Sequence, residues 1–243
     1  MNILITGVAG FIGFSIAREL LKNKNNHLIG IDNFSRYSGK EIKKLRLEIL
    51  KKDKKFKFLK IDIKNKKNIE KLFQKNYFDI VIHLAAEVGV RYSIKRPDKY
   101  VDTNIKGFLT IIEALKHNQP KKFLFASSSS VYGDSKIFPL KETQKLKPIN
   151  IYALSKKNNE EIAEIYASKY KTKFFGLRFF TVFGEFGRPD MFFFKLLFTA
   201  FNQTKLYLNN SGDHYRDFTY IKDVTKILKK MIYIKTNNNF YIL

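Results

Sequence analysis

Cysteine is absent from this chain of 243 residues. Its absence excludes disulfide bonds, thiolate nucleophiles and cysteine-ligated zinc. It is also compatible with a reducing, cytoplasmic location, which is where we expect the protein to be found. No cluster of His, Asp and Glu has the spacing of a metal site, so we expect no bound metal.

Long apolar runs are also lacking. The most apolar stretch outside the expected strands, MFFFKLLFTAF at 191–201, is interrupted by Lys195 and is eleven residues long. That is too short to span a bilayer. The chain opens on an apolar strand pattern rather than on a secretory signal. We therefore expect no membrane span and interpret 191–201 as a buried helix.

Acidic residues are scarce, with 22 Asp and Glu against 46 Lys and Arg, which gives a formal net charge of +24. Eight of the basic residues are arginines, so 46 − 8 = 38 are lysines. Base recognition and bidentate phosphate binding favour Arg over Lys. We therefore expect no nucleic-acid partner, and the charge suits a small anionic substrate equally well.

What is present is an alternation of strand and helix patterns. We expect strands at 2–6, 27–31, 56–60, 78–84, 121–127 and 173–178, and helices at 12–22, 40–52, 66–75, 97–118 and 152–170. Such alternation predicts an α/β fold, a Rossmann-like, doubly wound parallel sheet with helices on both faces. With 44% hydrophobic residues, the chain can bury a sizeable core.

The pattern changes after residue 178. A loop rich in Gly and Pro, RFFTVFGEFGRPD, is followed by the helix pattern at 191–201 and a short strand pattern at 206–208. We therefore predict a nucleotide-binding domain over 1–178 and a smaller substrate-binding lobe over 179–243.

A glycine-rich turn lies between the first strand and the first helix. In ITGVAGFIG, Gly7, Gly10 and Gly13 allow a tight turn and close approach of a pyrophosphate to the helix N-terminus. Asp32 ends the second strand, nineteen residues after Gly13. A carboxylate there binds both ribose hydroxyls and repels a 2′-phosphate, which favours NAD over NADP.

Two further strand ends reach the same crevice. Asp62 follows the third strand, where its carboxylate and the backbone of Ile63 could bind adenine; a helix N-cap is the alternative role for Asp62. The small Ala85 and Ala86 follow the fourth strand and allow close backbone approach to a dinucleotide. We interpret His83 as a packed residue rather than a ligand.

Tyr152 and Lys156 lie one helical turn apart and share a face. A nearby ammonium lowers the pKa of a phenol and makes it a usable general base. A solvated helix pair is the alternative. The fifth strand pattern ends in four serines, 127–130, and Ser128 precedes Tyr152 by 24 residues.

The order of these motifs resembles the extended short-chain dehydrogenase/reductase superfamily. The segments HLAAEVGVRYSIKRPDKYVDTNIKGFL, ASSSSVYG, LRFFTVFGEFGRPDM and RDFTYIKDV are similar to those of nucleotide-sugar 4-epimerases, and in particular UDP-glucuronate 4-epimerases. The resemblance implies an NAD-dependent enzyme that inverts the sugar through a 4-keto intermediate. It further implies that Ser128 is the catalytic serine, Tyr152 the base, and Lys156 the residue that holds the nicotinamide ribose and lowers the Tyr152 pKa.

The same resemblance places other residues. Thr181 and Arg188 match positions that handle the substrate carboxylate, and a guanidinium can pair with a carboxylate in a bidentate manner. Arg91 is a weaker candidate for that site, and Arg216 matches an arginine that binds the diphosphate. The cofactor site is expected to comprise Gly7, Gly10, Phe11, Ile12, Gly13, Asp32, Asn33, Asp62, Ile63, Leu84, Ala85, Ala86, Asn104, Tyr152 and Lys156.

Several alternatives share this scaffold. Related 4,6-dehydratases carry Asp-Glu at the positions of Ser129 and Ser130, and decarboxylating relatives carry Glu at 130, so both are disfavoured. A 4-epimerase of a neutral UDP-sugar, UDP-glucose or UDP-N-acetylglucosamine, stays open.

Members of the family continue beyond the point that TNNNFYIL occupies, so we expect an incomplete, C-terminally truncated lobe. A truncated NAD-binding protein without turnover is therefore another alternative. The resemblance also suggests a homodimer formed through 97–118 and 152–170.

Overall fold

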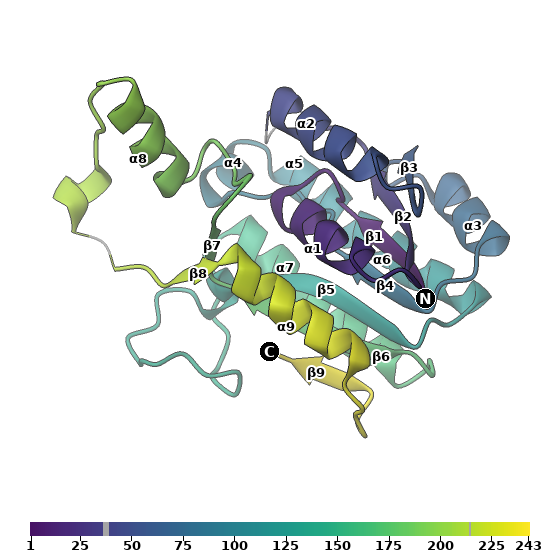
Figure 1. Ribbon diagram of the computed structural model, residues 1–243. Helices are drawn as coiled ribbons and strands as arrows, with labels where there is room; N and C mark the ends of the chain where they lie inside the picture. Colours follow the sequence, from purple (N-terminus) through teal and green to yellow (C-terminus); the bar gives the residue numbers. More distant parts are fainter. Residues whose placement is uncertain (36–38, 214) are drawn as a thin grey trace.

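Seven parallel strands form one sheet in the computed structural model, which describes residues 1–35, 39–213 and 215–243. Their order is β3-β2-β1-β4-β5-β6-β9 (Figure 1). The strands are β1 (Asn2–Thr6), β2 (His27–Asp32), β3 (Phe56–Lys60), β4 (Ile80–His83), β5 (Lys122–Ser128), β6 (Lys173–Phe179) and β9 (Phe240–Ile242). This is a doubly wound order that reverses beside β1, and it confirms the predicted fold class.

Helices cover both faces of the sheet (Figure 1). On one face lie α1 (Phe11–Leu21), α2 (Lys40–Lys51) and α9 (Ile221–Tyr233). On the other lie α3 (Lys66–Lys75), α6 (Gly107–Ala114) and α7 (Ile151–Ala167). Two hydrophobic cores result, one on each side of the sheet.

Strand β1 shows how the sequence builds both cores. Ile3 and Ile5 pack into the core of α1 and α9, whereas Leu4 packs into the core of α3 and α6. Successive side chains of a strand point to opposite faces, so a fully apolar strand is buried on both. All three side chains are inaccessible to solvent.

The helix expected over 97–118 is divided into several segments. It consists of α5 (Pro97–Tyr100), a π-helical segment (Val101–Lys106), α6 and a 3₁₀ turn (Leu115–His117). A short helix that sequence analysis missed, α4 (Val90–Lys95), precedes it. The six expected strands are present, and β9 is a seventh that was not expected.

The segment after residue 179 is built differently. Strands β7 (Thr181–Phe183) and β8 (Phe218–Tyr220) form a separate parallel pair, and α8 (Phe192–Phe201) lies between them in the chain. Figure 1 shows α8 standing away from the seven-stranded sheet.

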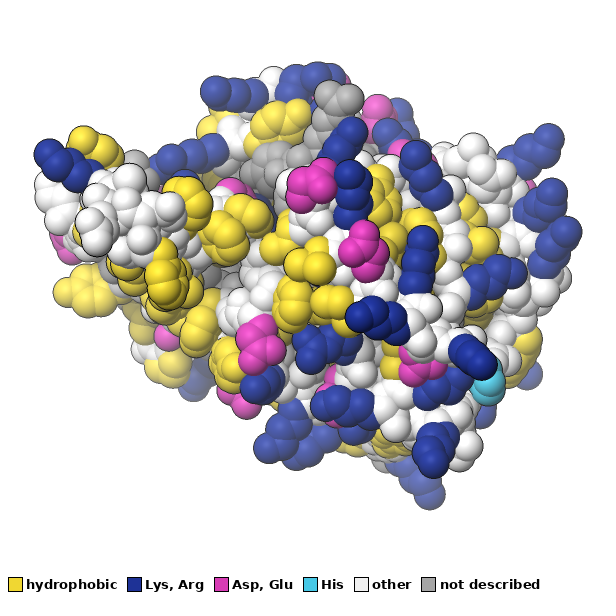
Figure 2. Space-filling model, turned by 45° about the horizontal axis from the view of Figure 1, so that its top comes forward, with side chains coloured by type: hydrophobic (Ala, Val, Ile, Leu, Met, Phe, Trp, Pro, Cys, Tyr) yellow, Lys and Arg dark blue, Asp and Glu magenta, His cyan; other side chains and the backbone are white. Residues whose placement is uncertain are grey.

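Two expectations for this segment are wrong. The helix pattern at 191–201 does form α8, but α8 has no buried residue, and Phe201 is 85% exposed. The first turn of α8 contacts the β7–β8 pair, where Phe193 stacks on Phe183 and meets Phe218 edge-to-face. Most of its other apolar side chains are exposed, and Figure 2 shows apolar side chains gathered at that end of the molecule. Residues 206–208 form no strand.

The predicted boundary at residue 178 stays a prediction. Beyond it, α9 packs against α1, and β9 pairs with β6 in the main sheet. The chain therefore returns to the nucleotide-binding sheet after β8. Within the described ranges, no helix combines the length and the apolar character needed to cross a membrane.

Candidate active site

The turn between β1 and α1 brings the backbone close to the end of β4. Gly7 has φ = +70°, and a Cβ atom there would lie 2.7 Å from the amide nitrogen of Ala85. A Cβ atom on Gly13 would collide with the carbonyl oxygen of Gly7. Helix α1 begins at Phe11 without a side-chain cap from Gly10. Its first N–H groups can therefore bind the oxygen atoms of a ligand.

Asp32 is held rigidly at the end of β2. Its carboxylate accepts hydrogen bonds from the backbone N–H of Ala9 (3.3 Å) and of Phe34 (2.7 Å). Lys43 of α2 donates a further bond of 3.2 Å, and both side chains of this ion pair are buried. Sequence analysis missed Lys43 because nothing in a lysine-rich helix distinguishes it from its neighbours.

The residues expected to bind adenine are divided. Ile63 lines the cavity, but Asp62 does not. The Asp62 carboxylate accepts bonds from the Asn33 side chain (3.1 Å) and from the N–H of Lys64 (2.9 Å). The alternative N-cap role for Asp62 is wrong, because Asn65 caps α3.

The end of β4 forms the centre of the cavity wall. Leu84, Ala85 and Ala86 line the cavity. Beneath them, the Thr6 hydroxyl bonds to Nδ1 of His83 (2.9 Å) and accepts from the N–H of Ala85 (3.1 Å). Burial lowers the pKa of His83 to about 3, so the imidazole is neutral. His83 is the packed residue that the sequence predicts.

Asn104 lies behind the cavity wall rather than in it. Its side-chain oxygen accepts from the N–H of Glu87 (2.8 Å), and its amide donates to the Glu87 carbonyl (3.0 Å) and to Ser155 (3.0 Å). Thr103 and Glu87 line the cavity instead. Burial raises the pKa of the Glu87 carboxyl. Asn104 therefore fixes the backbone of a residue that faces the cavity.

Ser128, Tyr152 and Lys156 meet at one side of the cavity. Ser128 ends β5, and the other two project from the first turns of α7. Lys156 is 3% exposed and donates a bond of 2.8 Å to the Ala126 carbonyl. Burial lowers the pKa of Lys156 to about 8. The predicted i,i+4 pair is thus part of a buried site rather than a solvated helix face.

The predicted lowering of the Tyr152 pKa is wrong for this structure. Burial raises the pKa of the Tyr152 hydroxyl, while a hydrogen bond with Ser128 and the charge of Arg188 act in the opposite direction. The Lys156 ammonium bonds to a backbone carbonyl instead of to the phenol. The groups that stabilise a phenolate here are Ser128 and Arg188.

A buried ion pair lies behind the serine-rich strand end. Arg178 of β6 donates to both carboxylate oxygens of Glu160 on α7, at 3.0 and 2.7 Å. Ser127 donates to the same carboxylate, and Arg178 also donates to the Tyr132 hydroxyl (2.9 Å). The side chains of Arg178 and Glu160 are each 6% exposed. This network joins β6 to β5, which carries Ser128, and to α7, which carries Tyr152.

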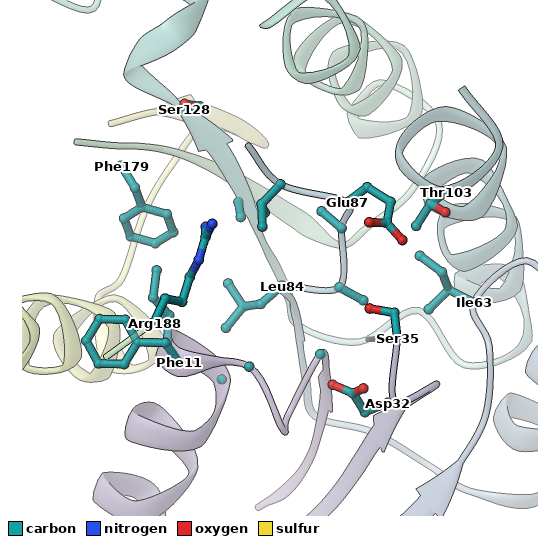
Figure 3. Close-up of a pocket in the computed structure, with 18 of the residues that line it drawn as sticks. Phe11, Asp32, Ser35, Ile63, Leu84, Glu87, Thr103, Ser128, Phe179 and Arg188 are labelled. Carbon is teal, nitrogen blue, oxygen red and sulfur yellow. The ribbon is translucent and has the colours of Figure 1, made fainter. Parts of the chain in front are cut away.

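Arg188 reaches into the cavity from the loop after β7. Figure 3 shows its side chain near Phe11 and Phe179, at the opposite end from Asp32. Its guanidinium donates to both carboxylate oxygens of Asp190, at 3.0 and 2.6 Å. In this structure its Nε–Nη2 edge is thus already paired with a carboxylate of the same loop.

The other predicted substrate residues do not line this cavity. Arg91 is exposed on α4, and Arg216 is exposed with a bond to the carbonyl of Tyr215 (2.8 Å). Thr181 is half-buried in β7, next to Val182, which does line the cavity. A role for Arg91, Thr181 and Arg216 in substrate binding stays a prediction.

The cavity therefore collects most, but not all, of the predicted site. The predicted residues that line it are Gly7, Gly10, Phe11, Ile12, Gly13, Asp32, Asn33, Ile63, Leu84, Ala85, Ala86, Ser128, Tyr152, Lys156 and Arg188. Those that sequence analysis missed are Ile31, Ser35, Lys43, Ile61, Glu87, Val88, Thr103, Ala126, Ser127, Phe179, Phe180, Val182 and Met191. Strand register could have found Ile31 and Ala126, because they neighbour predicted residues at the carboxyl edge of the sheet.

In residues 1–35, 39–213 and 215–243, no group of three or more acidic or histidine side chains is placed to hold a metal ion.

Comparison with known proteins gives consistent matches. The chain matches the model of the NAD dependent epimerase/dehydratase family over residues 3–240. It is 35% identical over 235 residues to a Rhizobium meliloti protein described as a probable UDP-glucuronate 4-epimerase. The matched region covers 96% of this chain and 69% of that protein.

Two solved structures are also similar. One is the UDP-glucuronic acid 4-epimerase from Bacillus cereus with UDP-glucuronic acid and NAD: TM-score 0.94, 35% identity, 100% of this chain and 76% of that chain covered. The other is a UDP-N-acetylglucosamine 4-epimerase from Methanobrevibacter ruminantium in complex with UDP-N-acetylmuramic acid: TM-score 0.86, 30% identity and the same coverage.

Proposed function

This chain belongs to the NAD dependent epimerase/dehydratase family, and from that premise we propose that it interconverts UDP-glucuronate and UDP-galacturonate by inverting the sugar at C4. The observation that carries the proposal is the position of Arg188. Its guanidinium enters the same cavity as Ser128 and Tyr152, and is the side chain there best suited to bind a sugar carboxylate.

The cofactor of this family is NAD. The cavity fits it, because the turn at Gly7 leaves no room for a Cβ atom beside Ala85, and the N–H groups of α1 have no side-chain cap. Asp32 would bind the adenosine ribose, and Lys156 would lie at the nicotinamide end. When bound, NAD supplies an acceptor and then a donor of hydride for the sugar C4.

The proton of the sugar O4 is assigned to Tyr152. Ser128 is close enough to hydrogen-bond the Tyr152 hydroxyl, and its single O–H would turn to donate to O4 once the sugar is bound. Tyr152 would have to be a phenolate to take the O4 proton as C4 loses hydride, and it would return that proton to O4 when hydride comes back. Burial disfavours this phenolate, because it raises the pKa of Tyr152. The charge of Arg188 lowers that pKa and so favours the phenolate.

Arg188 would have a second task. A 4-keto sugar with a C6 carboxylate is a β-keto acid, which loses CO₂ readily. The sugar carboxylate would displace Asp190 from Arg188, and the new bidentate pair would hold that carboxylate in one orientation and discourage decarboxylation. The positions after Ser128 carry Ser129 and Ser130, neither of which can serve as the acid or base of an elimination.

A 4-epimerase acting on a neutral UDP-sugar is the second candidate. Arg188 already has a bidentate partner, Asp190, in this structure. A sugar without a carboxylate would leave that pair intact. The similarity to a UDP-N-acetylglucosamine 4-epimerase supports the same alternative.

The test is incubation of the chain with UDP-glucuronate and NAD, followed by separation of the two epimers and measurement of CO₂. We expect UDP-galacturonate without CO₂. Turnover of UDP-N-acetylglucosamine alone would favour the second candidate. NAD binding without turnover of any UDP-sugar would indicate a binding protein.

Arg188→Ala sharpens the assignment. It should lower the turnover of UDP-glucuronate strongly, and Arg188→Lys should restore it only in part because an ammonium lacks the planar fork. Arg96→Ala is the matched control, since Arg96 makes the same kind of bidentate pair with Asp98, two residues further on, and does not line the cavity. An undiminished rate in Arg188→Ala would overturn the carboxylate role.

The homodimer predicted from the resemblance stays a prediction, which light scattering of the purified chain would test.

A further inference from the structure

Arg46 is an arginine that the proposed reaction does not use. It lies on α2 and is fully buried. One guanidinium nitrogen, Nη1, donates to the carbonyl of Ala9 at 2.9 Å. The other, Nη2, donates to the carbonyls of Phe186 (2.6 Å) and Gly187 (3.2 Å).

These carbonyls belong to two segments that lie far apart in the sequence and meet at Arg46. Ala9 lies in the glycine-rich turn, and its N–H is bonded to Asp32. Phe186 and Gly187 directly precede Arg188 in the loop after β7. A single planar side chain therefore links the dinucleotide turn to the segment that places Arg188. A lysine could not make both links in the same way, because its ammonium is a point charge without a fixed fork.

The loop end of this link is strained. Phe186 has φ = +59°, a left-handed conformation that a bulky side chain disfavours. Two contacts in addition to the Arg46 bond hold it there. The Phe186 ring packs edge-to-face on Phe14 at 5.0 Å between centroids, and the Arg18 guanidinium lies 5.6 Å from its centroid. Such conformations persist where the surroundings impose them, and they concentrate at functional sites.

The charges of Asp32 and Arg188 both act on the Arg46 guanidinium. Burial lowers the pKa of Arg46 to about 10, the charge of Asp32 raises it, and the charge of Arg188 lowers it. Arg46 is therefore a cation at neutral pH, within the field of the ribose-binding carboxylate and of the carboxylate-binding arginine. Its Nε atom has no hydrogen-bond partner within the described chain, so the backbone carbonyls account for its hydrogen bonds there.

We propose that Arg46 is a positioning residue that couples occupancy of the dinucleotide turn to the conformation of residues 184–190. With the turn fixed by NAD, the Ala9 carbonyl anchors one side of the guanidinium, and the other side holds Phe186 in its left-handed conformation. Arg188 is then presented to the cavity. The role of Arg188 toward a sugar carboxylate rests on the proposed function; the coupling itself does not.

Hydrogen–deuterium exchange of peptides covering 184–190 tests the coupling with NAD alone as the ligand. The N–H of Gly187 bonds to Gly184 (3.0 Å) and is a direct reporter of the loop conformation. In the unmodified chain, saturating NAD should slow exchange in this segment. In Arg46→Met, the loss of charge-assisted bonds should speed exchange by about tenfold or more and remove the response to NAD.

Arg18→Met is the matched control. Arg18 contacts the same Phe186 ring but is exposed and donates to none of the three carbonyls. It should retain the NAD response. Arg46→Lys keeps a charge without the fork and serves if Arg46→Met does not fold. It should lose at least half of the response.

The result that overturns the proposal is an equal NAD response in the unmodified chain and in folded Arg46→Met or Arg46→Lys. The absence of any NAD response in the unmodified chain, with NAD shown to bind, overturns it as well. Because no UDP-sugar is needed, the outcome is independent of whether the chain epimerises UDP-glucuronate. If it does, Arg46→Lys should raise the KM for UDP-glucuronate more than it lowers kcat.

Discussion

The two sides of the cavity differ in how many buried contacts hold their residues in place. On the sheet side, the polar groups are buried and paired: Asp32 with Lys43, Glu160 with Arg178, and Lys156 with a backbone carbonyl. On the other side, β7 and β8 have three paired residues each, and α8 buries no side chain. The difference teaches that buried pairs fix the polar groups on the sheet side, whereas a short strand pair, a cluster of phenylalanine rings and Arg46 attach the other side.

The largest expected effect is on turnover, from a substitution on the sheet side of the cavity. Tyr152→Phe should lower the turnover of UDP-glucuronate by about 10²- to 10⁴-fold, because the proton of O4 loses its carrier. NAD binding and thermal stability should be unchanged. Tyr166→Phe, on the same helix but away from the cavity, is the control. A Tyr152→Phe variant with more than about a tenth of the activity would break the assignment.

The next effect tests the buried ion pair. Arg178→Met should lower the free energy of unfolding by about 3–5 kcal/mol, because Glu160 is left charged and unpaired. Urea unfolding measures this. Lys157→Met, which removes the more exposed pair with Glu161 on the same helix, should cost less than about 1 kcal/mol.

A double variant sharpens that test. Arg178→Met combined with Glu160→Leu should recover part of the lost stability, since no buried charge remains. If Arg178→Met and Lys157→Met lowered the free energy of unfolding equally, the buried ion pair would contribute no more to stability than the exposed one.

A smaller effect is expected from the pH dependence of Lys156. Its pKa of about 8 in the folded chain lies below the usual 10.5. Between these values the unfolded chain binds more protons, so the contribution of Lys156 to stability rises with pH and is least favourable below about pH 8.

Lys156→Met removes this dependence. The stability of the unmodified chain relative to Lys156→Met should increase by about 2–3 kcal/mol from about pH 7 to about pH 10. Urea unfolding without NAD at both pH values measures it. The exposed Lys171→Met should show no such change; a similar change there would assign the effect to the overall charge.

The smallest effect is expected at the loosely held side. Phe201→Ser should change the free energy of unfolding by less than about 0.5 kcal/mol, because Phe201 is 85% exposed. Phe174→Ala, at a fully buried position of β6, should cost about 3–5 kcal/mol. If Phe201→Ser destabilises the chain by a comparable amount, α8 is covered in solution.

The sequence predicts the sheet side of the site well because its signals are local. Gly7, Asp32 and Lys156 each follow from a short motif at a strand end or on a helix face. Register along a parallel sheet then brings the strand ends together. The fold class follows from the same alternation.

The missed features depend on contacts between distant segments. Lys43 and Arg46 look like any basic residue of a surface helix until α2 is packed against α1 and β3, with Arg46 bonded to the loop at 184–190. The apolar pattern of 191–201 predicts a helix correctly but cannot say whether anything covers it. The raised pKa of Tyr152 depends on burial, which an i,i+4 spacing does not report.

The π-helical segment Val101–Lys106 has a consequence for how this chain tolerates insertions and deletions. A π turn accommodates one residue more than an α turn, and such turns are frequent at functional sites. Removing one codon from this segment would convert the wide turn into an α turn and take one residue out of the helix face that it presents. Thr103 would leave the cavity wall, or Asn104 would leave the backbone of Glu87. The wide turn is therefore what lets adjacent residues serve two different purposes, Thr103 in the cavity wall and Asn104 at the backbone of Glu87.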